Sequence, residues 1–226
     1  MFEVLLAGSL LLITHFGISS TSARDVLVGK LGEMGYQGLY SVISLVLVVL
    51  LVLGFNNAER LDYFWPINPD LYWIPKLTMP IAFVFLVGAF TSPNPTQVGM
   101  EEKMADDDPA RGMLRITRHP MMWAIVIFSL GHIAANGDTV AVAFFSVFLL
   151  LAGLGTLFID AKKARRQADA WPAFAAVTSN VPFVAILGGR NRLVLSELLA
   201  PIAIGLVLYV AVFWGHAWLS GVEIFW

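Results

Sequence analysis

Cysteine is absent from the 226 residues of this chain, histidine occurs only four times, and charged residues make up only 13% of it. Without cysteine the chain cannot form disulfides, cysteine-ligated zinc sites, thiolate-ligated or covalently attached haem, or cysteine-bound iron–sulfur clusters. Soluble domains carry about 25% charged residues, so the low charge argues against that class. The net charge of −2 offers no basic surface, and we expect no nucleic-acid partner.

Apolar residues are abundant instead: they make up 58% of the chain, and the mean hydropathy is +0.77. A helix that crosses a bilayer needs about 20 mostly apolar residues. We therefore expect an all-α polytopic membrane helical bundle, a single integral domain over residues 1–226 with the lipid bilayer around it. The apolar runs predict about six transmembrane helices, at residues 2–20, 36–55, 74–91, 120–136, 139–159 and 198–219.

End signals are clearest around the fourth and fifth predicted helices. Pro120 suits the first turn of a helix, where a missing N–H costs nothing. Asn136 and Gly137 form a stop signal, and Asp138 can cap the helix that follows. These two helices should form a tight antiparallel hairpin.

The positions of lysine and arginine predict the orientation of the chain in the membrane. Twelve of the 14 basic residues lie in three loops on one side, and only Arg60 and Lys76 lie on the other. Because basic loops stay in the cytoplasm, we place the three loops there and both termini outside.

The last of these loops, residues 160–197, carries apolar residues at near-helical spacing: Trp171, Phe174, Val177 and Val181. This pattern predicts an amphipathic helix on the cytoplasmic face of the membrane. An ordinary loop helix packed on the protein would show the same spacing.

Two histidines, His15 and His132, lie inside predicted transmembrane helices. Ionisable residues at this depth are costly and usually functional, and imidazole is a common haem ligand. Bis-histidine haem ligation from facing helices is therefore one interpretation, and a histidine hydrogen-bonded to a neighbouring helix is the other. The predicted depths differ, since His15 lies nearer the cytoplasmic side and His132 nearer the outer side. His119 would match His15 better in depth.

The sequence Arg118-His119-Pro120 is a second candidate site, at the start of the fourth predicted helix. The amides of a helix N-terminus can face an anionic group, and Arg115 and Arg118 would support such binding. The alternative is that these basic residues only mark the cytoplasmic end of a membrane-spanning helix.

Several short elements are spread over about the first 190 residues: His15 with Arg24, GEMGYQGLYSVIS (32–44), ITRHP (116–120) with Trp123, LGHIAANGD (130–138) and KKARRQ (162–167). Together they resemble the NnrU family. NnrU proteins are bacterial multi-pass membrane proteins linked to nitrite and nitric oxide reduction. A related carotenoid isomerase uses haem b to isomerise a double bond.

The resemblance implies haem b bound by His15 and His132, with the position of the isomerase's alternative cysteine ligand occupied by Ser129. It also implies an apolar polyene or a small gaseous ligand as the reaction partner, and a place in the bacterial inner membrane. With the orientation that the basic loops predict, both termini would then be periplasmic. Respiratory reductases are possible partners if the chain is instead a non-catalytic accessory or assembly factor.

A more distant likeness connects the RHP element and the hairpin after it to membrane methyltransferases that use S-adenosylmethionine. In that interpretation Arg118 and His119 would be the catalytic residues. The usual pair of glutamates after the hairpin is replaced by Asp160-Ala161.

Overall fold

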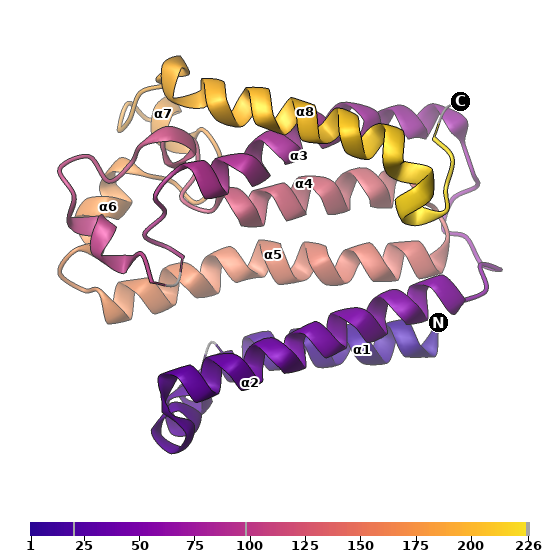
Figure 1. Cartoon of the computed structure of the whole chain (residues 1–226), viewed down its shortest axis with the longest axis horizontal. Helices are drawn as coiled ribbons and strands as arrows, with labels where there is room; N and C mark the ends of the chain where they lie inside the picture. The colour runs from indigo at the N-terminus through magenta and orange to yellow at the C-terminus, as the bar shows by residue number, and fades with distance from the viewer. Residues whose placement is uncertain (20, 98, 225–226) are drawn as a thin grey trace.

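The computed structural model describes residues 1–19, 21–97 and 99–224, and the described chain is helical, with a single isolated β-bridge between Tyr63 and Asp138. An all-α bundle is thus confirmed (Figure 1). Its helices are α1 (Phe2–Ile13), α2 (Ser22–Asn57), α3 (Trp73–Thr91), α4 (Pro120–Ala135), α5 (Thr139–Arg166), α6 (Trp171–Val177), α7 (Val184–Leu187) and α8 (Leu195–Ser220). Shorter turns are the π-helix η1 (Thr14–Ser19) and the 3-10 helices η2 (Pro69–Tyr72), η3 (Glu101–Ala105) and η4 (Gly112–Arg115).

Six of these segments correspond to the six predicted crossings. Five are long and apolar enough to span a bilayer: α1 with η1, α2, α3 with η2, α5 and α8. The sixth, α4, has 16 residues and is about 24 Å long, which is short for a hydrocarbon core of about 30 Å. The chain is a multi-pass membrane protein, and its two termini lie at the same end of the bundle (Figure 1).

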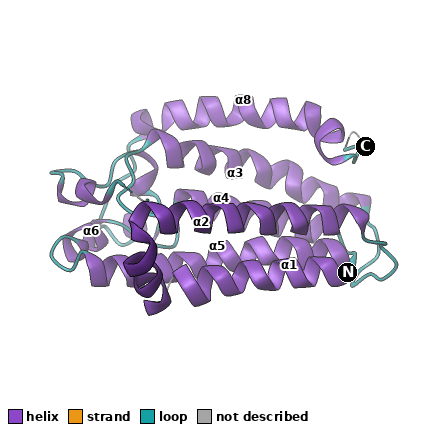
Figure 2. Cartoon of the chain, turned by 60° about the horizontal axis from the view of Figure 1, so that its bottom comes forward, coloured by secondary structure: helices purple, strands orange, loops and turns teal. Residues whose placement is uncertain are grey.

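The long helices form a curved row in the order α8, α3, α4, α5, α1 and α2, with each packed mainly on its neighbours in the row (Figures 1 and 2). Helix α2 begins earlier than the predicted start at residue 36 and bends at Gly32, whose φ of 73° lies in the left-handed region. The segment before the bend is rich in polar residues, so it lies outside the apolar run from which the start of this helix was predicted.

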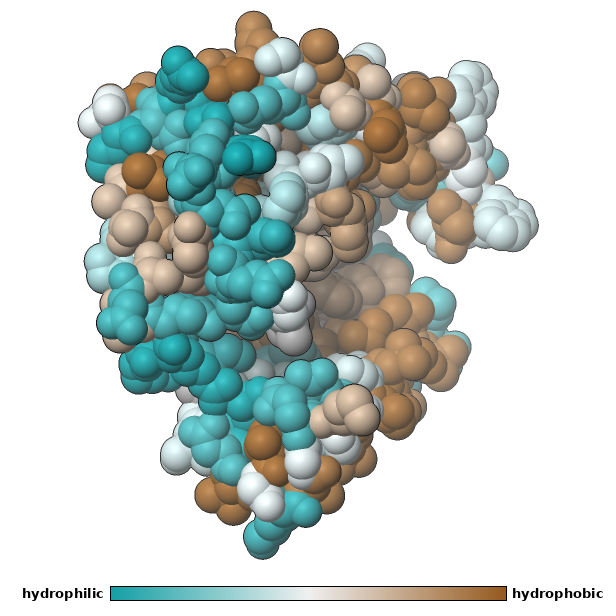
Figure 3. Space-filling model, turned by 60° about the vertical axis from the view of Figure 1, so that its left-hand side comes forward, coloured by the Kyte–Doolittle hydropathy of each residue, from teal (hydrophilic) through white to brown (hydrophobic). Residues whose placement is uncertain are grey.

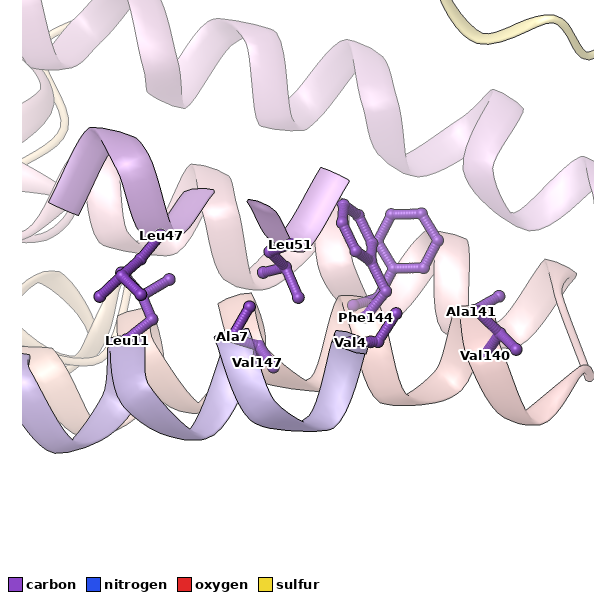
Figure 4. Close-up of a cluster of buried hydrophobic side chains, with 10 residues drawn as sticks. Val4, Ala7, Leu11, Leu47, Leu51, Val140, Ala141, Phe144 and Val147 are labelled. Carbon is purple, nitrogen blue, oxygen red and sulfur yellow. The ribbon is translucent and has the colours of Figure 1, made fainter. Parts of the chain in front are cut away.

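A buried apolar cluster joins α1, α2 and α5 (Figure 4). Gly8 lets α1 approach α5 closely, because a Cβ built there would lie 2.5 Å from a methyl group of Val147. The cluster consists of Val4, Ala7, Leu11, Leu47, Leu51, Val140, Ala141, Phe144, Phe145 and Val147. It fixes α1 alongside α5, which positions the residues that follow α1.

The predicted hairpin between α4 and α5 is confirmed. Helix α4 begins at Pro120, and the Asp138 carboxylate accepts a hydrogen bond from the Ala141 amide at 2.8 Å. Arg60 also contacts the Asp138 carboxylate, at 3.2 Å. The hairpin therefore holds α4 and α5 antiparallel, so the N-terminus of α4 lies near the C-terminal part of α5.

The end of the bundle opposite the termini carries the long polar loops, and Figure 3 shows polar residues gathered on it beside apolar flanks. The amphipathic helix expected there is short: α6 ends at Val177, and Val181 lies in a turn outside it. Phe174 is fully buried against the protein. Helix α6 therefore packs on the protein, against α5 and η3, as in the second of the two interpretations offered for this pattern.

Candidate functional site

His15 lies in η1, the π-helical continuation of α1. A π-helical turn is wider than an α-helical one and is frequent at functional sites. The Nδ1–H of His15 donates to the Leu11 carbonyl at 2.9 Å. In this tautomer the lone pair is on Nε2, which is the arrangement that metal-binding histidines commonly adopt. The His15 ring also meets the ring of Tyr40 edge-on, with centroids 5.3 Å apart.

A cavity of about 240 Å³ lies beside His15, which we call the His15 cavity. Its wall is mostly apolar, and its polar side chains come from two elements, η1 and α5. The lining residues are His15, Phe16 and Ser19 from η1, Met122 and Ile125 from α4, and Leu151, Ala152, Gly155, Phe158, Ile159 and Lys162 from α5. The cavity thus lies in the half of the bundle nearest the polar loops.

Three hydroxyl groups follow one face of α2 at four-residue spacing: Tyr36, Tyr40 and Ser44. The Tyr36 hydroxyl is buried and has no hydrogen-bond partner in the described part of the chain. The hydroxyls of Tyr40 and Ser44 lie close to one another, and that of Tyr40 lies close to Ser19, without a well-formed hydrogen bond. Buried hydroxyls without partners are costly, so this face is suited to a polar ligand or water.

His132 occupies a different environment, near the end of α4. Its Nδ1–H donates to the Phe128 carbonyl at 2.8 Å, and its ring lies against Phe128 and Phe145, with centroids 4.3 and 4.9 Å away. Ser129, one turn earlier, is buried, and its hydroxyl has no partner among the described residues. His132 therefore has the same tautomer as His15 but aromatic neighbours.

Helix α5 shows how far apart the two histidines lie along the bundle. His132 contacts Phe145, whereas the His15 cavity is lined by α5 residues from Leu151 to Lys162. The middle of that range is about eleven or twelve residues beyond Phe145, which corresponds to roughly 17 Å. The structure therefore places the two histidines at different depths, in line with the depths that the sequence predicts, and His132 does not line the cavity.

Arg118 and His119 meet Asp160 of α5 at the polar end of the bundle. The Arg118 guanidinium donates to both carboxylate oxygens, at 2.8 and 2.5 Å, and Nε2 of His119 lies 2.7 Å from the same carboxylate. The Asn180 side chain also donates to Asp160, at 3.0 Å. We call these four residues the Asp160 network. The anion that the RHP element contacts in this structure is thus a residue of the chain itself.

Comparison with known proteins identifies the group to which this chain is related. The NnrU protein family matches residues 3–224. The chain belongs to the NnrU family. The match reaches beyond the first 190 residues, over which the sequence motifs suggested the resemblance, and includes α8.

Two curated relatives of this NnrU chain are plant enzymes. The 15-cis-zeta-carotene isomerase of Zea mays is 35% identical over 130 residues, and that of Arabidopsis thaliana is 31% identical over the same length. Each alignment covers 55% of this chain and 32% of the relative, so the likeness spans about a third of the plant proteins. No solved structure matches the chain.

Haem b, which the NnrU resemblance implies, can be tested against this geometry. His15 fits an iron ligand, because its imidazole is oriented by a backbone carbonyl and borders a cavity with unpaired hydroxyls nearby. One iron shared by His15 and His132 does not fit the arrangement, because His132 packs on Phe145 and the middle of the His15 cavity lies roughly 17 Å further along α5. The cavity alone is also smaller than the 300–1,000 Å³ or so that drug-sized ligands usually occupy.

His119 is 2% exposed, and this burial lowers its pKa below the ordinary value of 6.5. The hydrogen bond to Asp160 opposes the shift, while the positive charges of Arg118 and Lys163 add to it. His119 is therefore neutral at pH 7 and donates its Nε2–H to Asp160.

The lowered pKa predicts how stability depends on pH. The unfolded chain binds the His119 proton more tightly than the folded one, so the free energy of unfolding should fall as the pH drops below 6.5. Thermal unfolding of the purified protein in detergent between pH 5 and 8 would measure this. His119→Gln keeps a donor for Asp160 but cannot titrate, so it should show a shallower slope. Equal slopes in both proteins would show that His119 does not contribute.

Three parts of the site were not predicted from the sequence as functional: Asp160, Lys162 and the hydroxyl face of α2. In the sequence Asp160 stands out only as a departure from the methyltransferase pattern. The four-residue spacing of Tyr36, Tyr40 and Ser44 within the GEMGYQGLYSVIS element was the signal that could have revealed a polar helix face.

Proposed function

We propose that this NnrU-family protein binds haem b within the membrane and has a redox, denitrification-linked or carotenoid-isomerase-like role. The observation that carries the proposal is His15, a membrane-embedded imidazole that is oriented by a carbonyl and borders a mostly apolar cavity. The likeness to the 15-cis-zeta-carotene isomerases supports an apolar polyene as the substrate class. A small gaseous ligand such as nitric oxide is the alternative.

In this proposal His15 would hold the iron through Nε2, and the bound haem would supply a Lewis acid or an electron donor. The chain supplies the apolar wall of the cavity, formed by residues such as Met122, Leu151 and Phe158, which excludes water and receives an apolar molecule. His132, the second predicted ligand, lies at another depth and does not line this cavity. Its role in haem binding is therefore tested by a variant of its own.

The absorption spectrum of the protein, expressed with haem supply and purified in detergent, tests the proposal. The oxidised and dithionite-reduced forms should show b-type bands near one haem per chain. His15→Ala should abolish the Soret band, while His216→Ala, at the opposite end of the bundle, should leave it unchanged. His132→Ala decides whether the second histidine contributes. Full haem content in the His15 variant would overturn the assignment of His15, and full haem content in both variants would overturn histidine ligation by either residue.

We also propose that the protein resides in a bacterial inner membrane with its two termini in the periplasm. The support is the concentration of basic residues in the loops at the end of the bundle opposite the termini.

Association with respiratory reductases belongs to the accessory-factor alternative, which predicts co-purification with a partner and no cofactor. The methyltransferase alternative predicts binding of S-adenosylmethionine near Arg118 and His119.

A further inference from the structure

Lys162 is a half-buried lysine at the edge of the His15 cavity that makes no ion pair or hydrogen bond within the described residues. Two basic neighbours on α5, Lys163 and Arg166, differ in this respect, whereas Arg165 is exposed to solvent. Lys163 contacts the Glu101 carboxylate at 2.9 Å and the Pro95 carbonyl at 3.0 Å, and Arg166 contacts Asp25 at 2.7 Å. The chain thus supplies counter-ions for Lys163 and Arg166 and leaves the half-buried cation at the cavity unmatched.

The charges around Lys162 make this arrangement unfavourable without a ligand. Arg24, Lys163 and Arg166 all lie close enough to repel it, and Glu101, the acidic residue that attracts it, is already bound to Lys163. A partly desolvated ammonium group among like charges raises the free energy of the folded protein. A bound anion at this position would lower that free energy. No neighbouring carboxylate does so, because Glu101 is engaged by Lys163.

Away from Lys162, toward the membrane centre, the lining of the His15 cavity is mostly apolar. Phe158 and Ile159 lie one turn before Lys162 on α5, and Met122, Ile125 and Leu151 continue the wall toward the membrane centre. Its mostly apolar lining, with one cation at its edge, suits an apolar body that has one charged end. A small inorganic anion would leave the apolar wall empty.

We infer that Lys162 is the anion-binding residue of the His15 cavity and that it takes the carboxylate of an amphiphile whose apolar body enters the cavity. Two sources share this chemistry: a haem propionate, and the carboxylate of a fatty acid or polyenoic acid. The haem source rests on the proposed function, whereas the fatty-acid source does not. The inference therefore remains testable if the protein binds no haem.

The experiment compares each acid with its ester, because esterification removes the charge and leaves the apolar body unchanged. The protein is expressed without added haem, purified in a non-ionic detergent and titrated with haemin or haemin dimethyl ester, followed by absorbance. A second titration uses cis-parinaric acid or its methyl ester, followed by fluorescence. The variants are Lys162→Gln, Lys162→Arg and, as the matched control, Arg165→Gln, an exposed cation three residues away on α5.

We expect the wild-type protein to prefer at least one acid over its ester by about tenfold, the effect of one charged hydrogen bond. Lys162→Gln should lose that preference, and Lys162→Arg and Arg165→Gln should keep it. Ester binding also reports whether each variant is folded.

The two titrations separate this inference from the proposed function. A preference for haemin over its ester that depends on Lys162 would assign the propionate. Failure to bind haemin, together with a Lys162-dependent preference for cis-parinaric acid, would assign the fatty or polyenoic acid and reject the haem proposal alone. Equal affinity of the wild-type protein for acid and ester in both titrations would overturn the inference, as would an unchanged preference in Lys162→Gln.

Discussion

Asp160→Asn should lower the free energy of unfolding by about 2–3 kcal/mol, somewhat less than the roughly 3–5 kcal/mol typical of breaking a fully buried ion pair. The Asp160 carboxylate is the common acceptor for Arg118, His119 and Asn180, and asparagine would leave the Arg118 charge without its partner. We expect less than that range because the Arg118 and Asp160 side chains are 13% and 17% exposed. For a chain of this length the loss corresponds to a fall in Tm of roughly 5–10 °C.

Thermal unfolding in detergent, followed by tryptophan fluorescence or by the fraction that remains monodisperse, would measure this fall. Asp107→Asn is the matched control, because Asp107 is exposed and makes no ion pair in the described structure. A Tm for Asp160→Asn that equals that of the control would mean that the network contributes little to stability.

Gly205→Val should separate α8 from α3. A Cβ at Gly205 would lie 2.8 and 2.9 Å from the Cα and N atoms of Val84, and these backbone atoms cannot move aside as a flexible side chain can. Small residues at such helix contacts allow close backbone approach in membranes. We expect a destabilisation of about 1–3 kcal/mol or more, typical of overpacking.

Gly215→Val provides the control in the same helix. A Cβ at Gly215 would meet only the end of Leu219, at 4.0 Å, so the change should leave the Tm within about a degree of wild type. Equal Tm values for the two glycine variants would show that the α3–α8 contact is looser than the structure indicates.

Local signals in the sequence predicted the helical elements well. The apolar runs located the crossings, and Pro120 and Asp138 marked helix starts because proline and capping residues act on their own backbone. The early start of α2 was missed, because its first part is polar and its bend at Gly32 depends on a single backbone angle.

The candidate site was only partly predictable. His15 was found because an ionisable residue in an apolar run stands out in one sequence. The pairing of Arg118 with Asp160 joins residues 42 positions apart, and nothing in the local pattern specifies it. The same holds for the cavity, whose walls come from η1, α4 and α5 and depend on the lateral order of helices. That order is decided by packing, which hydropathy does not encode.

The open row of helices affects how a molecule would reach the His15 cavity. A closed bundle would admit ligands from the aqueous ends, whereas helices in a row have broad flanks that contact the acyl chains directly. A lipid-soluble molecule would then arrive by lateral diffusion within the leaflet, after partitioning from water. Its apparent affinity would follow its mole fraction in the membrane instead of its total concentration, so vesicle experiments would need to vary the amount of lipid as well as that of the ligand.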